Sequence, residues 1–289
     1  MQTDYVANRK GANICMLISS CDAYSDIWPA MSQTMAAHWP DCPFPRFLMS
    51  NYDKAPAGFT TLAIGPDISW SANLIRGLEM IDHDYVLLSV DDLLLTRKVD
   101  THRLLESVCR AQRAKVAALQ LVTYENLWRR MGKWDDGSAI RIPVGGIYRA
   151  TAVFTLWDRR QLLKVLNPLE NAWQFEYCAS DRLDADSDVL VAVHNHFTFV
   201  NAIVKGKVTR SAYRLCEQKH YPLSASRPVM TAKESCAYGF LLLRASTFRF
   251  VPPGCRRAVK SAIQRAAFTV RELAGRRGIQ SNNSGANRA

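Results

Sequence analysis

The stretch "YVLLSVDDLLLT", residues 85–96, contains the pattern that decides the fold. Residues 85–90 are apolar except for one serine, and they predict a buried β-strand because strands covered on both faces have nearly continuous apolar sequence. Asp91 and Asp92 follow directly, and three leucines come after them. Two carboxylates about 4 Å apart repel each other by roughly 4 kcal/mol at an effective dielectric constant near 20. The pair therefore needs a retained proton, a cationic partner or a bound metal ion.

The segments before this strand alternate between strand and helix patterns. An amphipathic helix is predicted over 67–81, where Asp67 and Ser69 are capping residues. The other predicted elements are strands over 14–20, 45–51 and 59–65 and a helix over 25–39. This order is typical of an α/β domain with a mostly parallel sheet, in which ligands bind beyond the carboxyl ends of the strands. Asp91 and Asp92 stand at one such end.

The chain after the acidic pair is expected to continue the same domain. The predicted elements are a helix over 99–114, a strand over 115–124, a strand over 146–157, a helix over 158–166, a short helix or turn over 169–182, and strand-like alternation over 189–208. Residues 125–146 combine glycines and two tryptophans without periodicity, which predicts a long functional loop. Asp135 and Asp136 form a second acidic pair there, for which a plain turn is expected because a glycine follows.

The positive charge is concentrated in a C-terminal extension, residues 251–289, which follows an expected folded domain over 1–250. Eight Lys or Arg residues and one Glu in the extension contribute +7 of the net charge of +11. One face of a predicted helix over 254–274 carries Val259, Ile263, Ala266, Val270 and Leu273. A basic amphipathic helix is typical of a protein that lies on an anionic bilayer. The alternative is a helix that packs on the body of the protein with its charges solvated, and residues 275–289 are expected to be disordered.

The cysteines and the apolar runs indicate a cytoplasmic protein. Eight cysteines are scattered without a CxxC pair, which argues against a zinc ribbon or a disulfide framework and for reduced thiols. No apolar run approaches the roughly eighteen residues that a membrane span needs. The N-terminus has no basic region before a long apolar stretch, so no signal peptide is expected. If the basic extension binds lipid, the protein would lie on the inner face of the cytoplasmic membrane.

Six stretches in order carry a resemblance to a known family. They are "SSCDAYSDIWPAM" (19–31), "SNYD" (50–53), "DISWSANLIRGLEMIDHDYVLLSVDDLLLTRKVD" (67–100), "YRATAVFTLWDRRQLLKVL" (148–166), "NAWQFEYCAS" (171–180) and "NAIVKGKV" (201–208). Together they resemble nucleotide-sugar glycosyltransferases of the GT-A type, and among these the small bacterial enzymes that build capsule and lipopolysaccharide. The resemblance implies a GT-A-like, Rossmann-like domain. It also implies transfer of a sugar from a nucleotide-sugar donor to a surface polysaccharide or lipid-linked glycan, assisted by Mn²⁺ or Mg²⁺.

The resemblance gives the acidic pair a role. The metal motif of the family is Asp-x-Asp or a reduced acidic pair at the same strand end, and here Val90 replaces a first Asp. Asp92 would bind the metal that carries the sugar diphosphate. Asp91 would contact the ribose, or the metal through water. The alternative is an acidic pair that caps the next turn and faces water, and the departure at Val90 leaves metal dependence open.

Four further residues are candidates for binding the nucleotide sugar. Asp22 and Asp53 follow the first two predicted strands, where the resemblance implies contact with the base and the ribose. Either could instead be a turn residue, because Asp hydrogen-bonds locally in turns. Lys205 and Lys207 could meet the diphosphate, with the glycine between them allowing close approach. The alternative is an exposed basic hairpin.

Carboxylates and histidines in the second half are the remaining candidates. The resemblance implies that Glu176 is the general base that takes a proton from the acceptor hydroxyl, with Asp181 in reserve. Glu176 could instead be the partner of a nearby arginine. His194 and His196 would share one face of a strand and could be further metal ligands. The alternative for each is a hydrogen-bonded structural histidine.

Two other functions compete with this interpretation. A sugar nucleotidyltransferase would share the strand–helix order, but it usually has a glycine-rich basic phosphate loop after the first strand, which "SSCDAYSD" lacks. A non-enzymatic basic protein would bind membrane or nucleic acid through its tail, and its acidic pair would be incidental. For the glycosyltransferase no nucleic-acid partner is expected.

Overall fold

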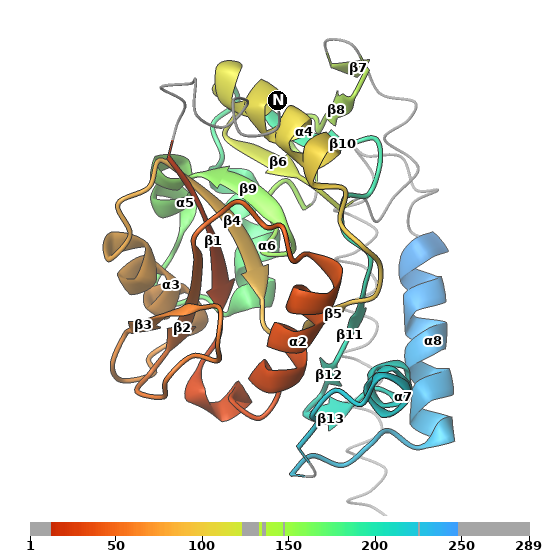
Figure 1. Ribbon diagram of the computed structural model, residues 1–289. Helices are drawn as coiled ribbons and strands as arrows, with labels where there is room; N and C mark the ends of the chain where they lie inside the picture. The colour runs from red at the N-terminus through yellow and green to blue at the C-terminus, as the bar shows by residue number, and fades with distance from the viewer. Residues whose placement is uncertain (1–12, 123–132, 135–136, 147, 225, 248–289) are drawn as a thin grey trace, which may run out of the picture.

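A computed structural model describes residues 13–122, 133–134, 137–146, 148–224 and 226–247. The central feature is a nine-stranded sheet in the order β3-β2-β1-β4-β9-β6-β10-β8-β7, with helices on both faces (Figure 1). Neighbours from β3 to β4 are parallel, whereas β9 runs antiparallel to β4 and β6, and β8 runs antiparallel to β10 and β7. The predicted α/β class with a mostly parallel sheet is confirmed.

The elements have the following bounds. The strands of the large sheet are β1 (Ile14–Ser19), β2 (Arg46–Ser50), β3 (Thr60–Ala63), β4 (Tyr85–Val90), β6 (Ala118–Gln120), β7 (Lys133–Trp134), β8 (Ala139–Arg141), β9 (Thr155–Asp158) and β10 (Val189–Ala192). The short outlying strands are β5 (Leu93–Leu95), β11 (Phe199–Asn201), β12 (Ile203–Val204) and β13 (Lys207–Val208). The helices are η1 (Asp22–Tyr24), α2 (Trp28–His38), α3 (Trp70–Glu79), α4 (Thr101–Arg113), α5 (Arg159–Val165), α6 (Ala172–Arg182), α7 (Arg210–Lys219) and α8 (Ala232–Thr247).

The strand β4 lies near the middle of the sheet because both of its faces are apolar. It pairs with β1 along all six of its residues and with β9 on its other edge. Residues 85–89 are all buried, which is the expected environment for a nearly continuous apolar run. The carboxyl ends of β1, β2 and β4 consequently meet at one edge of the sheet, and Asp91 and Asp92 follow β4 at that edge.

Each face of the sheet is covered by its own apolar core. Helices α2, α4 and α7 pack on one face, where the rings of Phe154 and Phe197 stack at 4.2 Å and Trp39 meets Phe197 edge-on at 5.3 Å. Helices α3, α5 and α6 cover the opposite face, where Phe175 lies 5.2 Å from the ring of Trp70. The side-chain caps that start these helices include Ser69 for α3 and Asp158 for α5, as predicted.

The prediction for 146–157 is wrong for most of its length. Only residues from Thr155 onward form a strand, because Tyr148 and Phe154 have φ values of 59° and 39°, which a strand does not allow. Polar contacts hold this irregular stretch in place. Gln120 Nε2 donates to the carbonyl of Tyr148 at 2.7 Å, and the buried Arg149 Nη2 donates to the carbonyl of Ser187 at 2.9 Å.

The predicted loop over 125–146 is also partly wrong. Residues 123–132 and 135–136, including the second acidic pair Asp135–Asp136, lie outside the described residues. In the described part, β7 pairs with β8, and β8 adds antiparallel to β10 at the end of the large sheet. Strands of two or three residues are too short to give a periodic pattern, so the sequence could not reveal them.

The region 189–208 forms three separate structures rather than one alternating strand. β10 is buried along its whole length in the large sheet. β11 leaves that sheet and pairs antiparallel with β5, the strand that begins directly after the acidic pair. β12 and β13 form a small hairpin. Residues 193–198 are not a strand, so His194 and His196 do not share a strand face as predicted.

The chain after this hairpin forms two helices that the sequence prediction did not assign. α7 packs on the body through Ala212 and Cys216. α8 lies at the edge of the molecule (Figure 1). The basic extension over 251–289 lies outside the described residues, so its predicted helix remains a prediction. Within the described part of the chain, no helix has both the length and the apolar character to span a bilayer.

The dependence of the fold on β4 can be measured with a matched pair of leucine substitutions. Leu87→Ala removes a fully buried side chain from the middle of β4, whereas Leu169→Ala removes one that is 86 % exposed. We expect Leu87→Ala to lower the free energy of unfolding by about 2–5 kcal/mol, because it leaves a cavity in the core. Leu169→Ala should change it by less than about 0.5 kcal/mol. Urea denaturation of both variants measures the difference, and equal values would show that β4 is not central to the core.

Candidate functional site

The acidic pair occupies a two-residue turn between two buried strands. β4 ends at Val90, Asp91 and Asp92 form the turn, and β5 begins at Leu93 with all three of its residues buried. Asp91 is only 6 % exposed, whereas Asp92 is partly exposed. The backbone carbonyl of Asp92 accepts a hydrogen bond from Ala202 N at 2.6 Å, which fixes the turn against the chain that follows β11. The pair does not face open solvent, so it is not a simple surface turn.

A short hydrogen-bonded chain orients the buried carboxylate of Asp91. Ser20, which follows β1, donates its hydroxyl to Asp91 Oδ2. Trp28, the first residue of α2, donates its indole Nε1–H to Ser20 Oγ at 2.7 Å. The serine can accept from the tryptophan and donate to the aspartate at the same time. Elements that are separate in the sequence therefore fix one carboxylate at the end of β4.

The two carboxyl groups carry negative charge that the described surroundings do not neutralise. Burial, followed by the charge of Asp92, raises the pKa of Asp91 to about 7. Burial raises the pKa of Asp92 to about 6. Among the described residues, no lysine or arginine forms an ion pair with either carboxylate, although the charge of Arg227 acts on Asp91 from a distance. An acidic pair in this state favours the approach of a cation.

Near the acidic pair, an arginine from the C-terminal part of the chain is held by another acid. The guanidinium of Arg227 donates to Asp26 from Nε at 2.7 Å and from Nη2 at 2.9 Å, and it stacks 4.6 Å from the ring of Tyr24. The hydrogen bond with Asp26 raises the pKa of Arg227, and the charge of Asp91 adds to that rise. Arg227 is therefore within electrostatic reach of the pair without neutralising it. Residues 226–230, here called the strap, are tied in this way to the loop after β1.

The predicted nucleotide contacts Asp22 and Asp53 lie together at the ends of β1 and β2. The carboxylate of Asp22 accepts the backbone N–H groups of Asn51 at 2.8 Å and Tyr52 at 2.9 Å, and more weakly that of Asp53. Asp22 thus joins the loops that follow two neighbouring strands, which is a positioning role. Asp53 is exposed at the same edge of the sheet. Contact of either residue with a nucleotide remains a prediction.

The candidate base Glu176 is anchored at the same edge of the sheet as the acidic pair. It belongs to α6, and its Oε1 accepts from Thr151 Oγ1 at 2.6 Å and from Ala152 N at 3.1 Å. Thr151 and Ala152 precede β9, which runs antiparallel to β4, so they lie toward the carboxyl end of β4. Asp181 is exposed on the same helix. The structure therefore brings Glu176 into a fixed arrangement with Thr151 and Ala152, at the edge of the sheet that carries the acidic pair.

The two candidate lysines form the turn of the β12–β13 hairpin. Lys205 and Gly206 have φ values of 52° and 74°, so the glycine serves the left-handed turn. Lys205 is exposed at this turn. Lys207 Nζ donates to Glu234 Oε1 of α8 at 2.6 Å. This hydrogen bond is the largest of the interactions that lower the pKa of Glu234 to about 2. The predicted basic hairpin exists, and the charge of Lys207 is paired with α8.

The histidines do not join the aspartates in a metal site. His196 is fixed through Nε2 to Ser107 Oγ of α4 at 3.1 Å, and burial lowers its pKa to about 4. His194 is exposed. Within the described residues, no group of three or more His, Cys, Asp and Glu side chains could hold a metal ion. His196 is therefore the hydrogen-bonded structural histidine that was the alternative prediction. Among the described residues, the two histidines do not join Asp91 and Asp92 in one ligand set.

Two adjacent carboxylates nevertheless suit a divalent ion that arrives with its substrate. Mg²⁺ is typically bound by one or two carboxylates and completes its shell with water and substrate phosphates. Asp91 and Asp92 supply hard oxygen ligands, and no described cation competes for them. The donor set therefore fits Mg²⁺ or Mn²⁺ bound together with a diphosphate, and it does not fit a metal held by protein ligands alone.

Several residues of the site escaped the analysis of the sequence. Ser20 and Trp28 lie within the resembling stretch at 19–31, but nothing in the sequence indicates that they reach Asp91. Asp26 also lies in that stretch, but Arg227 is about two hundred positions away and lies in no recognisable motif. Spacing in sequence gives no signal for such contacts, because only the folded chain brings the partners together.

No protein-family model matches the chain, and no curated protein matches it. Among solved structures it is similar to residues 1–349 of TarS from S. aureus, with a TM-score of 0.43 and 8 % identity, over 64 % of this chain and 59 % of that one. It is also similar to the galactosyltransferase LgtC solved with donor and acceptor sugar analogues, with a TM-score of 0.37 and 13 % identity, over 83 % of this chain and 98 % of that one. Likenesses of this size do not establish what this chain binds or catalyses.

The unbalanced charge of the pair predicts an unusual response to removing it. In a metal-free buffer at pH 8, we expect Asp92→Asn to raise the free energy of unfolding by on the order of 2 kcal/mol, because it removes one buried charge and its repulsion of Asp91. Both carboxyl groups have raised pKa values in the folded protein, so folding is penalised above about pH 7 and the penalty disappears as the pH falls toward 4.

Thermal melts in EDTA from pH 4 to pH 8 measure this difference. The difference in melting temperature between Asp92→Asn and the wild type should shrink as the pH is lowered. The control Asp41→Asn, at an exposed residue, should melt at the wild-type temperature at every pH. If Asp92→Asn melts at a lower temperature at pH 8, the pair stabilises the apo fold and the charge argument is wrong.

Proposed function

We propose that the chain is a glycosyltransferase that moves a sugar from a nucleotide-sugar donor to a glycan or lipid-linked glycan, with Mn²⁺ or Mg²⁺ at the acidic pair. The observation that carries this proposal is the pair itself. Asp91 and Asp92 are held at the carboxyl end of a central strand, where α/β folds bind ligands, and no described lysine or arginine forms an ion pair with them. A divalent cation would balance the charge of the pair, and the diphosphate that it carries would be the ligand at this edge of the sheet.

The chemistry of sugar transfer explains these residues. Cleavage of the sugar–phosphate bond develops negative charge on the departing diphosphate, and a bound divalent ion would stabilise that charge. Asp92, the more exposed acid, would contact the ion directly. Asp91, oriented by Ser20 and Trp28, would contact the ribose or a water molecule on the ion. The Asp22 bridge would keep the loops after β1 and β2 in position beside the donor.

Glu176 would receive the proton of the attacking acceptor hydroxyl. Its Oε1 is held by Thr151 and Ala152, so the carboxylate is oriented before substrate binds. A general base must lie within hydrogen-bonding reach of the proton that it takes. This role requires transfer with inversion at the sugar carbon, because only then does the acceptor oxygen attack from the face opposite the leaving diphosphate.

The competing functions explain the site less well. A protein that acts only through its basic tail gives no reason for two neighbouring carboxyl groups with raised pKa values. A nucleotidyltransferase would also bind a nucleotide with a metal, so the nucleotide-binding experiment must be accompanied by an assay of sugar release. Hydrolysis or transfer that yields a nucleoside diphosphate supports the glycosyltransferase, whereas release of pyrophosphate from a nucleoside triphosphate supports the nucleotidyltransferase.

Binding of nucleoside diphosphates tests the metal site. We expect one of UDP, GDP, CDP or ADP to raise the free energy of unfolding in the presence of Mn²⁺, by about 2.7 kcal/mol at a hundred times its dissociation constant. EDTA should abolish the effect, because the diphosphate is expected to bind through the ion. Asp92→Asn should lose the effect and the control Asp41→Asn should keep it. If Asp92→Asn responds like the wild type, Asp92 is not the metal ligand.

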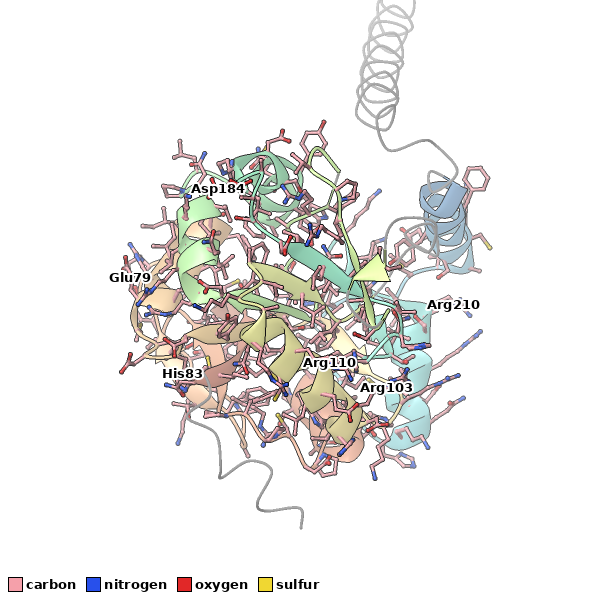
Figure 2. The ribbon with its side chains drawn as sticks, turned by 90° about the horizontal axis from the view of Figure 1, so that it is seen from above. Glu79, His83, Arg103, Arg110, Asp184 and Arg210 are labelled. Atoms are coloured by element: carbon pink, nitrogen blue, oxygen red, sulfur yellow. The ribbon has the colours of Figure 1, made fainter. Side chains whose placement is uncertain are left out.

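Substitution of Glu176 separates catalysis from positioning. Glu176→Gln retains an oxygen that can accept from Thr151 and Ala152, so we expect an unchanged melting temperature and unchanged diphosphate affinity. The loss of a general base should lower kcat by about 10²–10⁴-fold. Glu79→Gln, on the far side of the molecule from α7 (Figure 2), is the matched control. If Glu176→Gln has the kcat of the wild type, Glu176 is not the general base and has only a structural role.

A further inference from the structure

A second set of charged residues lies along α7 and takes no part in the function proposed above. A half-open groove of about 370 Å³ runs along α7 and is lined by Arg210, Tyr213, Arg214, Glu217 and Val229. Arg210 and Arg214 are one helical turn apart, so both guanidinium groups lie on the groove side of α7. Figure 2 shows Arg210 at the edge of the molecule, at the end of α7 nearer to α8.

The two arginines carry charge that is available to a ligand. Within the described part of the chain, neither guanidinium has a hydrogen bond or an ion pair. The neighbouring cations Lys207 and Arg227 differ in this respect, since each is paired with a carboxylate. From residue 205 to residue 233 the sequence has seven Lys or Arg residues and one acid. This part of the surface therefore attracts anions.

The groove and the acidic site share the strap as a common wall. Val229 lines the groove, and residues 228–230 run along β13 through hydrogen bonds from Val208 N to Pro228 O and from Met230 N to Val208 O. Two residues before Val229, Arg227 is fixed to Asp26 and Tyr24 beside the acidic pair. Residues two apart in extended chain are separated by about 7 Å. The strap thus connects the groove to the loop after β1, which carries Tyr24 and Asp26.

The lining suits a sugar that carries a phosphate. Guanidinium groups bind phosphate through paired, charge-assisted hydrogen bonds, and two of them match a dianion better than a single carboxylate. The ring of Tyr213, which is 40 % exposed, offers a surface on which a sugar can pack. The carboxylate of Glu217 can accept hydrogen bonds from sugar hydroxyls.

We propose that this groove is an acceptor subsite that binds a phosphoryl group attached to a sugar, with Arg210 and Arg214 as its phosphate ligands. The assignment of the ligand as an acceptor rests on the proposed function. The binding site itself does not, because it uses none of the residues of the acidic pair. The phosphoryl group could belong to a soluble glycan or to a lipid headgroup, and the chemistry of recognition is the same for both.

Titration of the full-length protein with glucose 1-phosphate tests the site. EDTA is included so that no metal ion brings phosphate to Asp91 and Asp92. We expect the wild type to bind glucose 1-phosphate and not glucose. Arg210→Gln/Arg214→Gln should weaken binding by about tenfold or more, because two charge-assisted contacts are lost. The control Arg97→Gln/Arg160→Gln removes the same charge from two exposed arginines elsewhere and should bind like the wild type.

The outcomes separate this proposal from the proposed function. Absence of binding by the wild type, or equal weakening in the two double variants, overturns the groove as a phosphate site. Failure of Mn²⁺-dependent diphosphate binding would instead overturn the metal site and leave this result standing.

A second arm of the experiment identifies the source of the phosphate. Vesicles of phosphatidylcholine with phosphatidic acid are sedimented with the wild type and with both double variants. If Arg210→Gln/Arg214→Gln sediments with the vesicles less than both the wild type and the control variant, the result supports the site and identifies the phosphate as that of a lipid headgroup. Equal retention of all three proteins, together with loss of glucose 1-phosphate binding in that variant, would support the site and assign a soluble glycan.

Discussion

The site depends on the electrostatic penalty of holding two carboxyl groups at the end of an apolar strand. Asp91 is buried and Asp92 adjoins it, and the pKa of each is raised because the folded protein supplies little to balance their charge. A fold tolerates such a penalty when a ligand relieves it. The indole of Trp28 and the hydroxyl of Ser20 orient the inner acid without neutralising it. The proposed metal site depends on this imbalance of charge.

The C-terminal part of the chain completes the surroundings of this pair. The strap reaches the loop after β1 through Arg227, and the same residues form a wall of the groove along α7. The cationic side chains of α7, the hairpin and the strap are divided into two groups. Lys207 and Arg227 have acidic partners that hold α8 and the strap in place, whereas Arg210 and Arg214 face the groove. This division leaves the charge of Arg210 and Arg214 available in the groove, on which the proposed phosphate site depends.

Much of the architecture could be predicted from local pattern, and the failures have a common physical cause. The apolar run of β4, the amphipathic pattern of α3 and the cap of α5 each depend on neighbouring residues, and they are found as expected. Tyr148 and Phe154 are apolar like strand residues, but left-handed backbone and the contacts of Gln120 and Arg149 break the strand there. The strands β7 and β8 form because β10 offers an edge, which no local pattern records.

The sequence alone determined where a site should be: two acids after the most apolar strand of an α/β domain, at the edge where ligands bind. It also named Glu176, whose place at that edge is consistent with the prediction. Only the tertiary structure decided which residues surround the pair. Ser20, Trp28, Asp26 and Arg227 converge there, while His196 is turned to Ser107 and Lys207 to Glu234. Side-chain partners across long stretches of chain are fixed by packing of the whole domain, and spacing along the sequence contains no record of them.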